Sequence, residues 1–379
     1  MREELVDLIS RLVAIDSVNP ALVAGGAGET EIAAFIAGWA GANGLEAVVT
    51  GGTAGRPSVV VRAPGSGRGR SLLLCGHTDT VGVEGMDEPF RARVEGDQLH
   101  GRGAYDMKAG LAAALLACRE AAAFGLAGDV IVAAVADEEH ASLGIEEALR
   151  FVRADGAIVT EPTELELVVA HKGFVWLELE VTGKAAHGSR PHLGVDAILK
   201  TGPILVSLGE LDRALAARTH PLLGHGSLHA SLIEGGAELS SYPARCVLKV
   251  ERRTLPGETV EVVETEVDRL LDECRARDPE LVAGRRTLLA REPLEVDAEH
   301  ELVDAVRAAL PVPARIAGAS YWADSGLIAA AGIPTVLFGP GGEGAHAARE
   351  WVSIDDTLVV TQTLAEVARR FCGSTAAAP

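Results

Sequence analysis

The first half of the chain alternates between short, continuously apolar runs and longer stretches with helical spacing. Continuous runs of Val, Ile, Leu and Ala predict buried strands over residues 58–63, 71–76, 130–136 and 156–162. Amphipathic or Ala-rich stretches predict helices over residues 1–16, 30–44, 109–125 and 144–154. Continuous apolar strands indicate a sheet that is covered on both faces, so this part is predicted to be α/β.

The pattern changes near Phe174, where "FVWLELEVTG" alternates apolar and polar residues as a half-exposed antiparallel strand does. Segments with helix, strand, strand and helix patterns then follow, over residues 194–215, 226–236, 244–254 and 259–277. This β-α-β-β-α-β-like order is typical of a small, ferredoxin-like α+β domain.

The α/β pattern returns after Arg291, with further apolar strands and helices up to a final helix that includes "TLVVTQTLAEVARRFC". The second domain is therefore predicted to be inserted into the first. We expect residues 1–173 and 292–379 to form one α/β catalytic domain and residues 174–291 to form the insert.

The composition narrows the class of protein. A chain of 379 residues is long enough for two domains, and its formal net charge of −20 disfavours binding to nucleic acid or to anionic membranes. The N-terminal segment lacks the apolar region of a signal peptide, and no apolar run is long enough to span a bilayer. The five cysteines are scattered without a C-x-x-C pair, which suits a reducing compartment. We therefore expect a cytoplasmic protein.

The stretch "SLLLCGHTDTVG" (Ser71–Gly82) leaves a predicted buried strand and presents His77 and Asp79 two positions apart. Residues at alternate positions of an extended chain point the same way. The pair is either a polar pair at the end of a strand or a metal ligand with a carboxylate behind it. This stretch alone leaves both interpretations open.

The stretch "GRGAYDMKAG" resembles the start of a dinucleotide-binding fingerprint through Gly101 and Gly103. Its third glycine position holds Asp106, whose carboxylate would repel a phosphate, and no clear buried strand precedes it. A nucleotide-dependent dehydrogenase is therefore disfavoured. Asp106 is either a metal ligand or a cap of the helix that is predicted to start near Ala109.

A third group of polar residues follows the predicted strand at residues 130–136, where the chain runs into Asp137, Glu138 and Glu139. Acidic residues are common at the start of a helix, and a helix is predicted to follow. Adjacent carboxylates at the end of a strand nevertheless repel one another unless a cation or a proton intervenes. One of them can bind a metal ion while its neighbour handles a proton.

Two more residues occupy comparable places. Pro162 favours an extended conformation at Glu161, which then emerges at the tip of a strand. His346 lies in the glycine-rich stretch "FGPGGEGAHAAREWV", with Glu350 four residues later. Taken singly, Glu161 is most simply a solvated acid and His346 a surface histidine. A glycine-rich loop after a buried strand, however, often lies at the ligand-binding edge of an α/β sheet.

Together these residues form the nitrogen and oxygen ligand set of a site for two zinc ions: His77, Asp106, Glu139, Glu161 and His346. In this hypothesis one acid bridges the ions, and one acid and one histidine complete each of them. Asp79 is then the carboxylate behind His77, and Glu138 remains as a general base. A serine hydrolase is disfavoured because the sequence contains no G-x-S-x-G motif.

In this order, the motifs H-T-D, G-R-G-A-Y-D-M-K-A-G, D-E-E, T-E-P-T and G-A-H-A-A-R-E-W resemble those of the M20 metallopeptidase family. The resemblance extends from "IDSVNP" near the N-terminus to the last helix. It implies the same five metal ligands, with Asp106 as the bridge, Glu138 as the general base and Asp79 in a supporting role. It also implies a cis peptide bond after Asp106.

The resemblance further implies that the insert is a dimerisation or lid domain, so that a homodimer is expected. Within the insert, "GKAAHGSRP" matches a family stretch whose histidine, here His187, reaches the active site of the neighbouring subunit. "ERRTLPGE" resembles a segment that makes Arg253 a candidate ligand for the substrate carboxylate. Two departures affect specificity: the family often has Asn near Ser240 or Ser241, and Asp where this chain has Glu251.

The reaction that the resemblance implies is zinc-dependent hydrolysis of an amide bond in an N-acyl amino acid, of the deacetylase or desuccinylase type. A carboxypeptidase or dipeptidase of the same family is the alternative. An inactive metal-binding homologue is a more remote one, because a binding protein has no use for Glu138. Cobalt or manganese can also occupy such a ligand set.

Overall fold

The computed structural model describes residues 1–50 and 55–373, which form two compact units. Unit 1 comprises Met1–Val169, Val296–Ala317 and the chain from Ala323 onward, and unit 2 comprises Ala170–Glu295 and Gly318–Trp322. The sequence placed the edges of the insert at residues 174 and 291, a few residues inside these bounds. It did not predict that the short strip Gly318–Trp322 joins unit 2.

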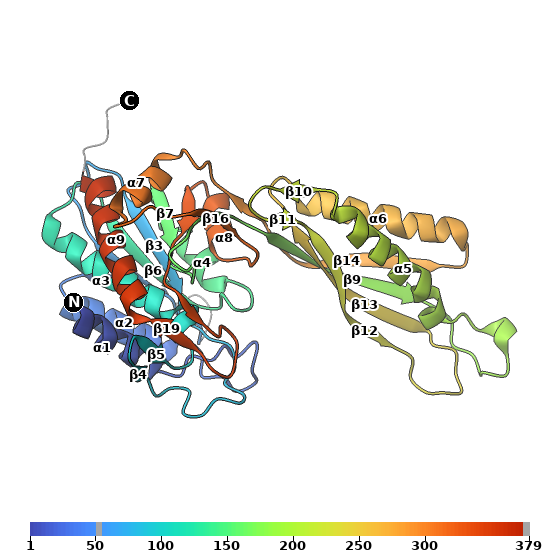
Figure 1. The fold of residues 1–379 in the computed structure, drawn as a ribbon. Helices are drawn as coiled ribbons and strands as arrows, with labels where there is room; N and C mark the ends of the chain where they lie inside the picture. Colours follow the sequence, from blue (N-terminus) through green and yellow to red (C-terminus); the bar gives the residue numbers. More distant parts are fainter. Residues whose placement is uncertain (51–54, 374–379) are drawn as a thin grey trace. The chain divides into compact units, whose positions relative to one another are not determined.

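The main sheet is mixed and runs in the order β1-β2-β6-β3-β7-β17-β8-β15, with β16 beside β8 (Figure 1). Its strands are β1 (Glu46–Val49), β2 (Val59–Ala63), β3 (Leu72–His77), β6 (Val130–Val135), β7 (Gly156–Val159), β8 (Leu167–His171), β15 (Leu294–Glu295), β16 (Ile316–Ala319) and β17 (Thr335–Leu337). The four strands predicted from continuous apolar runs all lie in this sheet. The predicted α/β class is therefore confirmed.

The helices of unit 1 are α1 (Arg2–Val13), α2 (Thr30–Ala42), α3 (Ala109–Phe124), α4 (Leu143–Ala148), α7 (Glu301–Ala309), α8 (Ser325–Ala330) and α9 (Ile354–Gly373). The Ala-rich α3 is buried along most of its length, because its small side chains let α1, α9 and the sheet approach closely. Figure 1 shows α3 and α9 lying across the sheet. Helix α4 ends at Ala148, six residues before the end of the predicted helix.

Strands β3, β6, β7 and β17 are parallel neighbours, so their carboxyl ends meet at one edge of the sheet. His77 is the last residue of β3, the turn with Glu138 and Glu139 follows β6, and Glu161 follows β7. The loop with His346 comes after β17. This topology brings together residues that are far apart in the sequence, as open α/β sheets do at their ligand-binding edge.

Unit 2 contains an antiparallel sheet in the order β12-β13-β9-β14, which packs against two helices. Its elements are β9 (Gly173–Thr182), α5 (Ala197–Leu215), β12 (Ser227–Gly235), β13 (Arg245–Thr254), α6 (Val260–Arg277) and β14 (Val282–Arg291). Numbered within the unit, this is the strand order 2-3-1-4 with β-α-β-β-α-β connectivity. The predicted ferredoxin-like insert is therefore confirmed.

The remaining short elements are β4 (Arg93–Glu95), β5 (Gln98–His100), β18 (Gly342–Glu343), β19 (Trp351–Ser353), β10 (Thr219–His220), β11 (Gly224–His225), a π-helical turn (Ala104–Lys108) and a 3-10 turn (Pro191–Leu193). Strands β18-β19-β5-β4 form a small sheet in unit 1. Within residues 1–50 and 55–373, no helix is both long enough and apolar enough to cross a membrane.

Candidate metal centre

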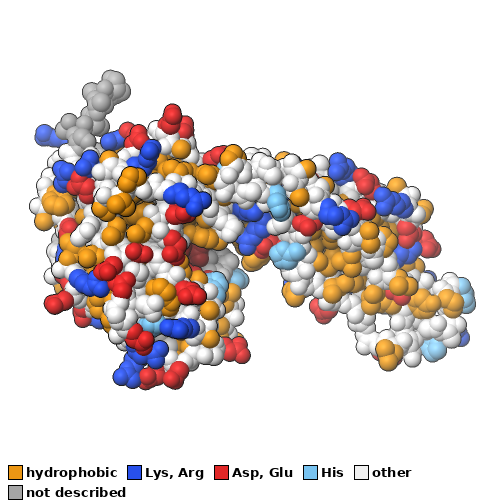
Figure 2. Space-filling model, viewed as in Figure 1, with side chains coloured by type: hydrophobic (Ala, Val, Ile, Leu, Met, Phe, Trp, Pro, Cys, Tyr) orange, Lys and Arg blue, Asp and Glu red, His pale blue; other side chains and the backbone are white. Residues whose placement is uncertain are grey.

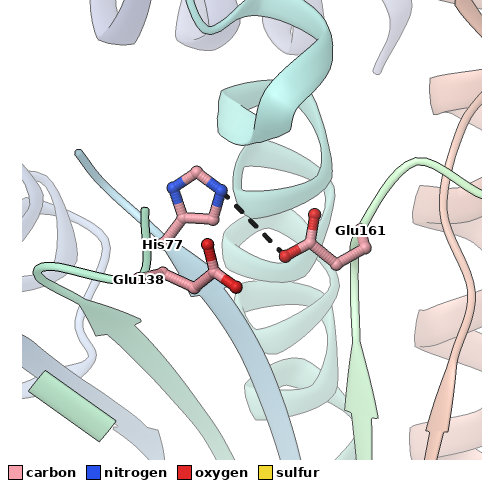
Figure 3. A group of neighbouring side chains, drawn as sticks. All are labelled: His77, Glu138 and Glu161. Atoms are coloured by element: carbon pink, nitrogen blue, oxygen red, sulfur yellow. Dashed lines mark ion pairs between the residues drawn. The ribbon is translucent and has the colours of Figure 1, made fainter. Parts of the chain in front are cut away.

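The side chains of His77, Glu138 and Glu161 converge at the carboxyl edge of the main sheet (Figure 3). They come from the ends of three neighbouring strands, and one ligand atom from each lies within 4.8 Å of the others. His77 Nε2 is 4.0 Å from Glu161 Oε1. An imidazole and two carboxylates at this spacing provide a plausible donor set for a divalent cation.

A second group joins the first through His77. Ligand atoms of His77, Asp106 and Glu139 also lie within 4.8 Å of one another. His77 Nε2 is 3.0 Å from Asp106 Oδ1, and His346 Nε2 is 3.4 Å from Asp106 Oδ2 and 3.0 Å from Glu139 Oε2. The structure therefore brings together all five predicted ligands and the predicted general base.

Asp106 is held by its own backbone. The peptide bond between Asp106 and Met107 is cis, as the family resemblance implied. Helix α3 begins at Ala109 and its N-cap residue is Lys108, so Asp106 does not cap this helix. The two oxygens of its carboxylate instead face His77 and His346.

Glu350 clamps the segment that carries Asp106. Its Oε1 accepts hydrogen bonds from the backbone N–H groups of Tyr105 and Asp106, at 2.9 and 3.1 Å. Its Oε2 accepts one from the backbone N–H of Gly103, at 3.0 Å, and one from Arg102 Nη1, at 2.7 Å. The sequence singled out Glu350 only by its distance from His346, without a role.

The loop between β18 and β19 presents His346, which is left-handed with a φ of 62° and about half exposed. Gly344 in the same loop has a φ of 91°, and a Cβ atom there would lie 1.8 Å from the carbonyl oxygen of Arg349. Only glycine fits at that position. The tight loop thus turns the imidazole of His346 towards Asp106 and Glu139.

Asp79 is placed differently from our expectation. His77 Nδ1 lies 2.9 Å from the backbone carbonyl oxygen of Asp79, whereas the nearer carboxylate oxygen is 3.7 Å away. The carboxylate instead accepts hydrogen bonds from the backbone N–H groups of Glu138 and Glu139, at 3.1 and 3.3 Å. The carboxylate of Asp79 is thus directed towards the turn after β6, and the backbone carbonyl is the closer partner of His77.

The electrostatics of the cluster call for positive charge. Burial and the charge of Glu161 raise the pKa of Glu138 well above its ordinary value. Burial, together with the charges of Asp106 and Glu139, also raises the pKa of Glu161 to about 8 against the influence of His77. Hydrogen bonds to Asp106 and Glu139 raise the pKa of His346 to about 10. Cations at this position would offset the repulsion between these carboxylates, so the residues fit a site for metal ions.

One further acid was not identified from the sequence. Asp324 immediately precedes α8 and is buried, and its negative charge contributes to the raised pKa values of Glu138 and Glu161. The only signal in the sequence is an acid in "SYWADSG", before a short helix. That pattern also fits an ordinary residue at the start of a helix.

His187 and Arg253 both belong to unit 2, so their predicted roles stay predictions. His187 is exposed, and its Nδ1 lies 2.8 Å from Ser189 Oγ. Arg253 Nε donates to Glu251 Oε1 at 2.7 Å, and its guanidinium carbon lies 5.5 Å from the centre of the Phe174 ring. Glu251, which stands where the family often has Asp, thus holds Arg253.

The fold and the cluster define a hydrolase of the M20 type, and comparison with known families agrees. Residues 73–370 match the family described as Peptidase family M20/M25/M40, and the chain belongs to this family. The predicted family is therefore confirmed.

Among the relatives, an acetylornithine deacetylase from Pectobacterium atrosepticum is 30% identical over 383 aligned residues, covering 97% of both chains. A solved M20 family metallo-carboxypeptidase from Sulfolobus solfataricus has the same fold, with a TM-score of 0.77 and 20% identity, covering 97% of this chain and 99% of that one. A dinuclear metal-binding M20 peptidase from Bacillus subtilis gives a TM-score of 0.76 at 16% identity, covering 98% of each chain.

Proposed function

We propose that this chain is a two-metal hydrolase that cleaves the amide bond of an N-acyl amino acid. The observation that carries the proposal is that two adjacent acids fall in two groups of possible metal ligands that share His77. Glu139 is bonded to His346, while Glu138 groups with His77 and Glu161. Both acids thus lie among the possible metal ligands, and we propose that Glu139 binds metal while Glu138 moves a proton.

Five residues would hold the two ions, which we propose to be zinc, with cobalt or manganese as alternatives: His77, Asp106, Glu139, Glu161 and His346. Asp106 is proposed as the bridge because its two oxygens face different histidines. When bound, the ions would polarise the amide carbonyl and lower the pKa of a water molecule.

Glu138 is proposed as the general base that accepts a proton from the attacking water and returns it to the leaving amine. A general base works best when its pKa lies near the working pH. Burial and the charge of Glu161 raise the pKa of Glu138, which supports this role. The buried Asp324 adds to this shift and would help to keep a proton on Glu138 between the two transfers.

The substrate is proposed from two observations. The acetylornithine deacetylase relative, aligned along almost the whole chain, supports an N-acyl amino acid. Arg253 would hold the substrate carboxylate, and its pairing with Glu251 and its place over Phe174 fix its direction. The carboxypeptidase of the same fold supports a peptide as the alternative substrate.

Unit 2 is proposed to pair two copies of the chain and to bring His187 of each copy to the other's metal centre. Strand β12 lies at the edge of its sheet and exposes Leu232 and Ile233, and the neighbouring α5 exposes Leu199 and Val206. Hydrophobic side chains gather over this part of unit 2 (Figure 2). An apolar edge strand next to an apolar helix face is suited to pairing with a second copy.

A cytoplasmic location is also proposed. All five cysteines are free and buried, which is the usual state of cysteines in a reducing compartment.

A substrate panel tests the proposed function. The protein, loaded with zinc, cobalt or manganese, is assayed on N-acetyl and N-succinyl amino acids and on dipeptides. We expect hydrolysis of an N-acyl amino acid that requires metal and increases the free amine. A fully metal-loaded protein that cleaves none of these amides would support the inactive homologue instead.

The variant Glu138→Gln tests the division of labour. It should keep both metal ions and lose about 10²–10⁴-fold in kcat, the range expected for a general base. Glu139→Ala is the matched comparison at the adjacent position and should lose metal as well as activity. A Glu138→Gln protein that elemental analysis finds stripped of metal would show that Glu138 is a ligand rather than the base.

A further inference from the structure

A buried polar network lies behind the turn that carries Glu138 and Glu139. It consists of Asn19, Glu29, Arg56, Asp79 and Asp137, of which four are fully buried and Arg56 keeps only 10% of its side chain exposed. None of these side chains is among the proposed metal ligands. Arg56 binds two of the three buried carboxylates, Glu29 and Asp137, and Asp79 lies in the same network. Three buried carboxylates with a single guanidinium are costly to assemble, so the network calls for an explanation.

Asn19 ties two of the carboxylates together. Its Nδ2 donates to Asp79 Oδ2 at 2.8 Å and to Asp137 Oδ1 at 3.1 Å. The amide cannot be reversed without loss, because its Oδ1 accepts a hydrogen bond from the backbone N–H of Ala21 at 2.9 Å. The backbone N–H of Asn19 also donates to Thr80 O at 2.9 Å, which fixes the "SVNP" segment beside Asp79.

Arg56 holds the outer side of the same network. Its Nε and Nη2 bind the two oxygens of Glu29 at 2.6 and 2.7 Å, and Nη2 also binds Asp137 Oδ1 at 2.7 Å. A bidentate pair of this kind has a defined direction as well as a charge. Asp137 is therefore held from two sides, by Asn19 and by Arg56.

The backbone explains why such a hold is needed. Asp137 has a φ of 69°, a conformation that residues with a side chain rarely adopt. Its carbonyl oxygen accepts hydrogen bonds from the N–H groups of Ala141 and Ser142, which closes a tight turn directly after β6. The next two residues, Glu138 and Glu139, bind through their backbone N–H groups to the two oxygens of Asp79.

We propose that Asn19 and Arg56 are positioning residues that set the directions of Glu138 and Glu139 through Asp79 and Asp137. Asp79 is the hub, because each of its oxygens binds the backbone of one of the two adjacent acids. Without Asn19, the Asp79 carboxylate keeps its bonds to the backbone of Glu138 and Glu139 but loses the amide that ties it to Asp137, so the turn is held less firmly. The consequence for kcat rests on the proposed role of Glu138, whereas the consequence for the backbone does not.

The variant Asn19→Ala, in the metal-loaded full-length protein, tests the proposal. We expect kcat to fall by about 10–100-fold, because a small misplacement of a catalytic group can cost about 10²-fold. KM should stay unchanged, and metal is kept saturating so that weaker metal binding through a displaced Glu139 does not itself lower kcat. Amide hydrogen exchange of a peptide spanning residues 137–142 should become faster. Asn43→Ala is the matched control, since Asn43 Nδ2 also donates a partly buried hydrogen bond, to Trp39 O at 2.8 Å, at the end of α2.

A second pair of variants separates positioning from stability. Arg56→Met leaves Glu29 and Asp137 without their cation and should lower the melting temperature. The double variant Glu29→Leu/Arg56→Met removes one of the buried charges and should recover part of the melting temperature. It should not recover kcat or the slow exchange of the turn, because Asp137 still lacks its hydrogen bond from Arg56.

The outcomes are distinct. Unchanged kcat and unchanged exchange in Asn19→Ala overturn the positioning proposal, and so does a fall in kcat at full metal loading while the exchange of the turn stays unchanged. If the wild-type protein hydrolyses no amide, the proposed function fails, but faster exchange of the turn in Asn19→Ala still supports the positioning of the two acids. Hydrolysis by the wild type with no effect in the variant removes the positioning proposal alone.

Discussion

Replacing Glu350 by glutamine should destabilise unit 1 and weaken metal binding, although Glu350 is not a proposed ligand. Its carboxylate accepts four hydrogen bonds, three from the backbone that leads to Asp106 and one from Arg102. It is only 2% exposed, so water cannot replace these partners. Glutamine keeps the shape of the side chain and changes only its charge and one acceptor.

The expected loss follows from the geometry. The Nε2 atom of glutamine is a hydrogen-bond donor, so it cannot accept hydrogen bonds from the two donors that it faces. These are the N–H groups of Tyr105 and Asp106 in one orientation, and those of Gly103 and Arg102 in the other. If it faces Tyr105 and Asp106, two buried N–H groups lose their acceptor, each at about 1–3 kcal/mol. In either orientation Arg102, 2% exposed, loses its anionic partner, and breaking a buried ion pair in this way costs about 3–5 kcal/mol. Because these contributions overlap, we expect a loss of about 3–5 kcal/mol.

A urea titration followed by hydrogen-exchange mass spectrometry of a peptide from β3 reports the stability of unit 1 by itself. Zinc affinity, measured by competition with a chelator, should fall by about 10–100-fold, as is usual when a group that supports a ligand is lost. Glu343→Gln is the control, because Glu343 is the last residue of β18, directly before the same loop, and is exposed. Surface changes of this kind are typically within about 0.5 kcal/mol.

The reasoning fails if Glu350→Gln costs less than about 1 kcal/mol and leaves zinc affinity unchanged. Such a result would mean that the cis segment around Asp106 keeps its place without the clamp. A loss of stability with unchanged zinc affinity would separate the two effects and would remove only the link between Glu350 and the proposed ligand Asp106.

Two further predictions concern protons and assembly. Zinc affinity should rise between about pH 6 and pH 8, because Glu161 and His346 must release protons when metal binds. Their pKa values are raised to about 8 and about 10. Calorimetry in two buffers of different ionisation enthalpy counts these protons, and no release at about pH 7 would contradict the prediction. His187→Ala should bind metal and be nearly inactive, since loss of one oxyanion donor costs about 10²–10³ in rate. Mixing it with Glu138→Gln should restore up to about a quarter of wild-type activity, because each heterodimer contains one intact composite site. Heterodimers that form but stay inactive would show that His187 does not act across an interface.

The parts of the site that could be predicted are those that local patterns specify. A few residues of sequence are enough to predict a buried strand that ends in His77 and another that is followed by Glu138 and Glu139. The carboxylate contacts of Asp79 could not be predicted, because its two oxygens accept hydrogen bonds from the backbone N–H groups of Glu138 and Glu139, about 60 positions away in the sequence. The same holds for Glu350, which reaches back over more than 240 residues to the backbone before Asp106.

The supporting network illustrates the same limit. Arg56 stands alone in an unremarkable turn sequence, and only the fold brings it to Glu29 and Asp137. Helix α4 ends at Ala148, although the apolar spacing of the residues that follow favoured a longer helix. Local spacing reports which residues prefer to be buried, whereas the partner that satisfies each buried polar group depends on tertiary contacts.

The place of β17 in the main sheet has a consequence for biosynthesis. This strand lies between β7 and β8, although it follows both of them by more than 160 residues in the sequence and is therefore made much later. Until it arrives, the nascent chain carries two open strand edges in the middle of its largest sheet, and such edges are sites of aggregation. His346 follows only a few residues later. Until this segment has been made, the emerging chain therefore lacks one of the five proposed ligands.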